Sequence, residues 1–196
     1  MSEIAEIKGR IGFRGYTRAD LVSENEGAIT LSPSNIINEQ VDFTKCSYIS
    51  WTKYEESPEI KAEVGDIVFC KTASVGKTAL IKYLPKETTI NPQFVLLKNI
   101  KCNQSYLSYI LKDNTFQNKI KAITGQGTIP TFTQKEFCEL TIPIPPLSEQ
   151  ERIVAILDKF DALVNDLTQG LPAEIEARRK QYEYYRNKLL TFKKIA

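Results

Sequence analysis

The sequence contains no histidine, and its four cysteines are far apart. Histidine is the usual general base and a member of the common catalytic triads, so its absence argues against hydrolytic chemistry. Cys46, Cys70, Cys102 and Cys138 form no CxxC pair. A zinc site is therefore not expected, and the cysteines are better explained as small hydrophobic residues of a core.

Long apolar stretches are also missing. A helix that crosses a bilayer needs about 20 consecutive apolar residues, and no run of that length occurs. The first residues, Met1-Ser2-Glu3, do not begin a signal peptide. With 42% hydrophobic and 26% charged residues, the composition is that of an ordinary globular protein. We therefore expect a cytoplasmic location and no membrane partner.

Motifs for binding nucleotides and for methyl transfer are absent. Gly76-Lys77-Thr78 matches the end of GxxxxGK[ST], but Lys71 stands where the first glycine is needed. No glycine-rich cofactor motif accompanies it. Ile144-Pro145-Pro146-Leu147 lacks the flanks of the [DNS]PP[YFW] tetrapeptide of adenine methyltransferases. We therefore expect no metal and no cofactor in this chain.

The net charge of +2 is distributed unevenly along the chain. From Asp20 to Asp66 there are ten acidic and three basic residues, whereas Ile67 to Lys135 holds ten lysines and two acidic residues. If these segments occupy different faces, the basic face could follow a phosphate backbone. A solvated lysine-rich surface explains the pattern equally well.

Residues 1–147 carry short apolar runs separated by turns, which is typical of a mixed, mainly β domain in an α+β fold. Strands are expected at Gly27–Leu31, Ile67–Cys70, Phe94–Leu97 and, as the last strand of the domain, Leu140–Ile144. From Gln104 to Ile120, apolar residues recur at a spacing of three or four, which predicts one helix of about four turns.

Three glycine-containing loops carry side chains of the types that bond phosphates and base edges. The candidates for DNA contact are Arg10, Arg14 and Tyr16 in the first loop, Lys71, Thr72, Ser74 and Lys77 at a hairpin tip, and Gln126, Thr128 and Thr131 in the third loop. Plain exposed loops and turns are the alternative explanation.

Residues 148–196 have the pattern of a long amphipathic helix. Pro145-Pro146 excludes a helix before it, and Ser148, followed by Glu149, is a typical N-cap. Apolar residues recur as in a coiled coil, with Arg178 as the polar exception. The series are Ile153, Ile156, Phe160, Leu163 and Leu167, then Leu171, Ile175, Tyr182, Tyr185 and Leu189. The series shifts near Gly170-Pro172, which predicts a kink or a break between two helices.

A continuous helix over Ser148–Phe192 would be about 67 Å long at 1.5 Å per residue. One small domain cannot cover such a rod, so the apolar seam predicts a partner chain. Tyr182, Tyr184 and Tyr185 add aromatic area that is typical of interfaces. The alternative is an intramolecular hairpin that turns at Gly170 and buries its own seam.

The run IPIPPLSEQERIVAILDKFDAL, followed by LPAEIEARRKQYEYYRNKLL, resembles the conserved region of type I restriction–modification specificity (S) subunits. The resemblance is strong over residues 141–192 and looser before them. In that family, each target recognition domain is followed by such a helix, and the helices pair antiparallel as a spacer. Family members usually carry two domain–helix units, whereas this chain has one.

The resemblance implies a DNA-recognition subunit without chemistry of its own. In the family, methyl transfer with S-adenosylmethionine and cleavage driven by ATP and Mg belong to separate modification and restriction subunits. The conserved helices resemble the surface that recruits the modification subunits, and the restriction subunit joins through the assembled complex. We expect a homodimer in which each domain, residues 1–147, reads a half-site of a bipartite target in double-stranded DNA.

Three possibilities stay open. The chain is either such a single-unit subunit or a one-domain fragment of a two-domain S subunit that pairs its helices within one chain. A coiled-coil adaptor without a DNA role is the third possibility, which binding to random duplexes would separate from the other two.

Overall fold

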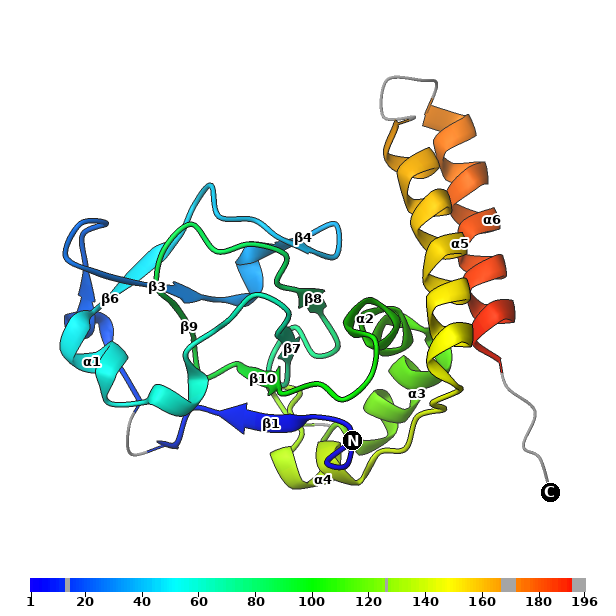
Figure 1. Ribbon diagram of the computed structural model, residues 1–196. Coiled ribbons are helices and arrows are strands. Elements are labelled where there is room, and N and C mark those ends of the chain that lie inside the picture. Colours follow the sequence, from blue (N-terminus) through cyan, green and yellow to red (C-terminus); the bar gives the residue numbers. More distant parts are fainter. Residues whose placement is uncertain (13–14, 126, 167–171, 192–196) are drawn as a thin grey trace.

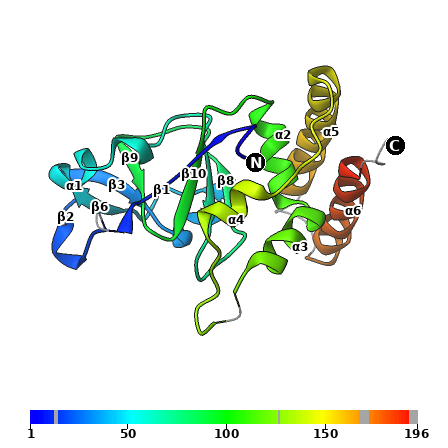
Figure 2. The same cartoon turned by 90° about the horizontal axis from the view of Figure 1, so that it is seen from below.

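A computed structural model describes residues 1–12, 15–125, 127–166 and 172–191, without the side chains of residues 163–166, 172, 173 and 175. A strand-rich part lies at one end of the molecule and a pair of long helices at the other (Figure 1 and Figure 2). The chain is thus α+β, as predicted. In the described ranges, no helix combines the length and the apolarity needed to cross a membrane.

Two four-stranded sheets form the strand-rich part. The first has the order β1 (Glu6–Gly9), β10 (Phe94–Lys98), β7 (Ile67–Cys70) and β8 (Thr78–Leu80), with every pair antiparallel. The second has the order β2 (Leu21–Val22), β6 (Ser47–Ser50), β3 (Gly27–Leu31) and β9 (Thr88–Ile90), and its last pair is parallel. A separate hairpin consists of β4 (Ile36–Ile37) and β5 (Gln40–Val41), and the short helix α1 (Trp51–Glu55) follows β6.

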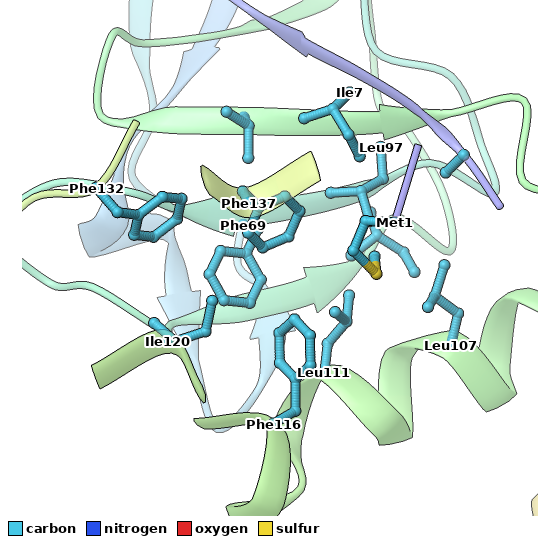
Figure 3. Packing of buried hydrophobic residues seen from close by; sticks show 13 residues of the cluster. Met1, Ile7, Phe69, Leu97, Leu107, Leu111, Phe116, Ile120, Phe132 and Phe137 are labelled. Atoms are coloured by element: carbon cyan, nitrogen blue, oxygen red, sulfur yellow. The ribbon is translucent and has the colours of Figure 1, made fainter. Parts of the chain in front are cut away.

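The core of the first sheet is aromatic (Figure 3). Phe69 of β7 lies against Phe116 and Phe137, with ring centroids 6.1 Å and 4.9 Å away. These rings come from α3 (Asn114–Ile123) and α4 (Gln134–Glu139), and α2 (Gln104–Lys112) adds apolar residues to the same cluster. Alternate residues of β7 point to the opposite face of the sheet. There, Cys70 is fully buried in the cluster shared with the second sheet, which is the core role predicted for it.

The predicted helix over Gln104–Ile120 is two helices, because the chain breaks at Asp113. This residue is extended, with φ −65° and ψ 143°, and its carboxylate accepts a hydrogen bond from the amide of Thr115 at 2.8 Å. Asp, Asn and Thr bond the nearby backbone and therefore favour caps over helix interiors. The run Asp113-Asn114-Thr115 ends α2 and caps α3, which the apolar spacing alone did not reveal.

The predicted last strand at Leu140–Ile144 is also wrong. The segment is extended but pairs with no strand of the described structure. Pro143, Pro145 and Pro146 have no amide hydrogen and cannot donate to a ladder. The segment instead runs alongside the helices, and Tyr106 of α2 donates a hydrogen bond to the carbonyl of Pro143 at 3.1 Å.

The C-terminal region forms two helices, α5 (Leu147–Asp166) and α6 (Pro172–Leu190), which lie side by side and run antiparallel (Figure 1). The break that the sequence predicted is present, and the residues that join the helices lie outside the described ranges. Since α5 begins at Leu147, Ser148 lies inside the helix and not at its cap. Antiparallel pairing therefore occurs within one chain, as in the hairpin alternative, rather than in a continuous rod.

Candidate nucleic-acid interface

The loop between β7 and β8 is a tight hairpin turn. The amide of Gly76 donates to the carbonyl of Cys70 at 3.1 Å, and the amide of Lys77 donates to that of Ser74 at 3.3 Å. Gly76 has φ +93°, and a Cβ at this position would lie 2.3 Å from Oε1 of Gln117. A strand follows Lys77, whereas a phosphate-binding P-loop is followed by a helix. The hairpin prediction is confirmed, and the P-loop is excluded on geometry.

The tertiary structure joins two of the three predicted loops. Thr72 and Thr131 are 59 residues apart in the sequence, yet their hydroxyl oxygens are 2.9 Å apart. The amide of Ala73 donates to the carbonyl of Pro130 at 2.9 Å, and the amide of Phe132 donates to that of Lys71 at 3.2 Å. Residues 71–77 and the described residues of 125–131 therefore form one continuous feature, which we call the paired loops.

The second of the paired loops projects from the body between α3 and α4 (Figure 2). Thr128, Ile129, Pro130 and Thr131 are exposed, and 60% of the surface of Ile129 is open. Gln126, which the sequence selected as a base-reading residue, lies outside the described ranges. A base edge presents hydrogen-bonding groups and, on thymine, an apolar methyl group. Threonine hydroxyls suit contact with the first kind, and an exposed apolar residue such as Ile129 suits contact with the second.

Lys71 lies at the base of the paired loops, half-buried. Burial lowers the pKa of its ammonium, and no anionic partner for it is present among the described residues. Its Nζ is 3.8 Å from the position that a Cβ on Gly9 would take, so the glycine leaves room beside it. Lys77 is exposed, and its Nζ lies 3.4 Å from the carbonyl oxygen of Pro33. Both lysines remain available to an anion such as a phosphate.

The first predicted loop is arranged differently. Arg10 is only 6% exposed, and its guanidinium donates to the carbonyl of Ile90 at 3.4 Å and to the hydroxyl of Thr89 at 3.5 Å. It also lies over the ring of Tyr16, 5.3 Å from the centroid. Arg10 therefore does not take the exposed position that we expected, because it bonds the edge of β9 and packs on an aromatic ring. Arg14 lies outside the described ranges.

Tyr16 is half-buried, and its hydroxyl lies 3.2 Å from that of Thr30 in β3. Its ring contacts the buried cluster of Ala28, Ile49 and Tyr54. These contacts attach the start of the chain to the second sheet, so the expected exposure of Tyr16 is only partial.

The basic segment is partly neutralised inside the fold. Lys98 pairs with Asp66 at 2.8 Å, and Lys112 pairs with Glu39 at 3.4 Å. Desolvation nevertheless raises the pKa of Asp66, since this carboxylate is almost fully buried. Sequence counting thus overstated the free positive charge, because it cannot see which lysines are paired.

Two exposed lysines flank the projecting loop and were not selected from the sequence. Lys121 is near the end of α3, before the loop, and Lys135 is near the start of α4, after it. Their position on either side of residues 125–131 adds charge next to the paired loops. Their position next to the loop in the sequence could have identified them, whereas counting the lysines of the whole segment could not.

Comparison with known proteins identifies the family of the chain. The model of the type I restriction modification DNA specificity domain matches residues 3–177. The chain belongs to this family. The specificity subunit of the Escherichia coli EcoR124I/EcoR124II enzyme is 53% identical over 68 residues, which are 35% of this chain and 17% of that protein. The putative MjaX specificity subunit of Methanocaldococcus jannaschii is 30% identical over 165 residues, 80% of this chain and 37% of that protein.

Solved structures share the fold of this specificity domain. The HsdS subunit from Thermoanaerobacter tengcongensis aligns with a TM-score of 0.63 at 21% identity, covering 96% of this chain and 43% of that chain. The S subunit from M. genitalium aligns with a TM-score of 0.55 at 17% identity, over 85% of this chain and 39% of that chain. The chain therefore spans less than half the length of each of these relatives.

The helical hairpin of the specificity domain uses much of its apolar stripe within the chain. Ile153 and Leu157 of α5 and Tyr182 and Leu190 of α6 are buried against Tyr106 and its neighbours on α2. Leu157 and Leu190 were missing from the predicted seam, whereas Ile156, Phe160 and Leu189 are only half-buried. The buried face of each helix is thus shifted by about one residue from the predicted seam, because the helices pack on α2 as well as on each other.

The remaining seam residues divide into described and undescribed positions. Phe160 stacks on Tyr185 with ring centroids 5.6 Å apart and an interplanar angle of 13°. Tyr184 and Tyr185 keep 60% and 36% of their surface exposed. Leu167 and Leu171 lie outside the described ranges, as do the side chains of Leu163 and Ile175.

Proposed function

We propose that this chain recognises one half-site of a bipartite target in double-stranded DNA and does so through the paired loops. The observation that carries the proposal is the joining of residues 71–77 and 125–131 by the Thr72–Thr131 contact at 2.9 Å. The contact residues that we propose on these loops are Lys71, Thr72, Ser74, Lys77, Thr128 and Thr131. Lysines would hold phosphates, and threonines with Gln126 would meet base edges.

The chemistry of the system would belong to other subunits. The relatives are named as specificity subunits of type I restriction enzymes, and this chain would act with a modification subunit that carries S-adenosylmethionine. The restriction subunit, with ATP and Mg, would join through the assembled complex. The helical hairpin is the surface proposed for recruiting the modification subunits, since its outer face is not needed for packing on α2.

The proposed active form is a homodimer joined through α5 and α6. Leu147, Tyr184 and Tyr185 are apolar or aromatic and exposed on these helices, as expected of a contact surface. A two-fold axis between two copies would present two identical DNA-reading domains, and the target would then be a gapped inverted repeat. The boundary of the reading domain stays at residues 1–147 in this proposal, with residues 148–196 as the spacer.

A second candidate is a fragment of a two-domain specificity subunit. It is favoured by the coverage, because the chain accounts for 37% of one curated relative and 43% of one solved chain. In a two-domain protein the second reading domain differs from the first, so the target would be asymmetric.

The deciding experiment is the mapping of methylated sites in DNA from cells that contain this chain and its cognate modification subunit. A gapped inverted repeat with methylated adenine supports the homodimer. An asymmetric target contradicts it and supports the fragment. If methylation remains but is independent of this chain, the DNA-reading role itself is wrong.

The paired loops are tested separately by replacing Lys71 and Lys77 with Glu. Binding to duplex DNA is expected to be lost at moderate salt, because two phosphate contacts become repulsive. Unchanged binding by the folded variant would exclude the paired loops as the contact surface.

A further inference from the structure

The β4–β5 hairpin meets the helical hairpin through one acidic residue at its tip. Asn38 and Glu39 form the turn and have φ values of +48° and +62°. Such left-handed pairs form the type I′ turn of two-residue hairpins, in which asparagine and glycine are preferred. Glutamate adopts this conformation at a cost. Contacts of its side chain therefore have to offset the cost of the turn.

The carboxylate of Glu39 lies between two cations from different helices. It is 3.4 Å from Nζ of Lys112 on α2 and 3.8 Å from Nη1 of Arg186 on α6. Nζ of Lys112 also donates to the main-chain carbonyl of Glu39 at 3.3 Å. The side chains of Lys112 and Arg186 are only 13% and 7% exposed. Buried cations need a counter-charge, and Glu39 supplies one to both.

Aromatic residues hold the two cations in place. The guanidinium of Arg186 lies over the ring of Tyr182, 5.5 Å from the centroid, and Lys112 lies over that of Tyr109 at 5.9 Å. The hydroxyl of Tyr109 donates to Asp158 of α5 at 2.6 Å. The contacts of Glu39 therefore reach α2 and α6 directly and α5 through Tyr109.

Apolar packing does not bridge the hairpin and α6. An open cleft lies here and is lined by Glu39, Lys82, Lys112 and Asp161, among others. The apolar cluster that contains Ile36 of the hairpin shares no member with the helical cluster among the described residues. Across this gap, the direct attachment is ionic.

We propose that Glu39 is a positioning residue that locks the strand-rich part to the helical hairpin and so fixes the direction of the paired loops relative to α5 and α6. A hairpin tip bound to α2 and α6 at once resists rotation of one part against the other, which a contact to one helix alone would not do. Apolar packing on α2 holds the parts together, and the Glu39 contacts select one orientation.

The functional consequence rests on the function proposed above. If the length of the helices determines the gap between two DNA half-sites, the angle between each domain and the helices also affects the length of that gap. Glu39 would then contribute to the choice of gap length without touching DNA.

The lock is tested by measuring a distance that spans the junction. Spin labels on non-canonical amino acids at Thr52 of α1 and Gln181 of α6, both exposed, report the orientation by double electron–electron resonance. Labelling of this kind avoids the four native cysteines. In Glu39→Gly, the carboxylate is removed while the positive φ suits the new residue, so the turn still forms. The distance distribution is expected to broaden and its mean to shift.

Two further variants make the test specific. Glu39→Gln keeps the size of the side chain. It is expected to broaden the distance distribution and to shift its mean in the same direction as Glu39→Gly, but by a smaller amount. Glu56→Gln removes the Lys53–Glu56 pair at 2.9 Å on the surface of the strand-rich part and is expected to leave the distribution unchanged. A wild-type distribution in folded Glu39→Gly, confirmed by circular dichroism, overturns the lock.

Methylation assays with the modification subunit then test the consequence. Glu39→Gly is expected to accept targets whose gap is one base pair longer or shorter, which the wild-type chain rejects. Unchanged gap selection despite a broadened distance distribution would overturn the role in spacing. If the wild-type chain supports no site-specific methylation, the proposed function fails while the distance measurement still decides the lock.

Discussion

At the scale of single residues, free charge decides what each lysine can do. Lys77 is exposed at the end of the loop that precedes β8, whereas Lys98 and Lys112 of the same basic segment are paired with carboxylates. An ammonium already paired inside the protein releases no counterions from DNA when a complex forms. Only the unpaired lysines therefore contribute to salt-dependent binding.

The first prediction concerns Lys77. Lys77→Ala should weaken duplex binding to a similar degree for all sequences and reduce the slope of log K against log salt by about 1, since one phosphate contact is lost. Fluorescence anisotropy over a salt series measures both quantities. Lys45→Ala is the matched control, because Lys45 is exposed but lies in the acidic segment. Equal slopes for Lys77→Ala and the wild type would remove Lys77 from the interface.

The second prediction concerns the buried phenol of Tyr182. Desolvation, against an opposing effect of Arg186, raises the pKa of Tyr182 from 10.0 to about 12. Since the unfolded chain loses this proton first, the contribution of Tyr182 to stability is complete below pH 10 and is lost as the pH rises through about 12. Tyr182→Phe should therefore show a smaller fall in the free energy of unfolding across this interval. Urea titrations at several pH values measure it.

Tyr184→Phe provides the control for that experiment. Tyr184 is 60% exposed on the same helix, so its replacement removes a hydroxyl that the fold does not bury. If Tyr182→Phe and Tyr184→Phe gave the same curve, the buried hydroxyl would not be the source of the effect.

At the scale of elements, packing decides which face of a helix is buried. The spacing on α5 selected Ile153 and Ile156, but the structure buries Ile153 and Leu157 against α2. Both pairs satisfy a helical repeat, because residues three and four apart share one face. The choice between them depends on the direction from which α2 approaches, which is not a property of α5.

The third prediction follows from this difference. Leu157→Ala should lower the free energy of unfolding by about 3 kcal/mol, because it opens a cavity in a fully buried site, whereas Ile156→Ala should cost about 1 kcal/mol. Chemical denaturation of the two variants makes the comparison. A larger loss for Ile156→Ala would restore the predicted seam as the buried face.

At the scale of the whole molecule, the question is what covers the outer face of the helical hairpin. Its inner face is buried within the chain, so the hairpin no longer needs a partner to hide its main stripe. The exposed Leu147 on α5 and the exposed tyrosines on α6 are the remaining reasons to expect a second copy. The sequence argument for a dimer assumed a continuous rod, and the hairpin makes the contact surface smaller.

The fourth prediction is a dimer with a mass near twice the 22.3 kDa of one chain. Light scattering measures the mass, and Tyr184→Ser should shift the population toward the monomer without lowering the melting temperature, because the side chain is largely exposed. Lys180→Ser on the same helix is the control, with a side chain that is 75% exposed. A strictly monomeric wild-type chain at all accessible concentrations would contradict the homodimer.

The sequence by itself determined the α+β class, the buried strands, the break near Pro172 and the family. These follow from local properties, namely apolar spacing, proline chemistry and a long motif, which act between residues close in the chain. It did not determine the break at Asp113 or the missing strand at Leu140–Ile144, where capping and lost amide donors outweighed the apolar pattern.

Only the tertiary structure decided how distant segments meet. It joined residues 71–77 to 125–131, withdrew Arg10 from the surface, turned α5 toward α2 and set Glu39 between Lys112 and Arg186. Each of these depends on residues that are far apart in the chain and become neighbours only when the sheets and helices pack. Burial and pairing of a charge are properties of that packing, and no local pattern in the sequence encodes them.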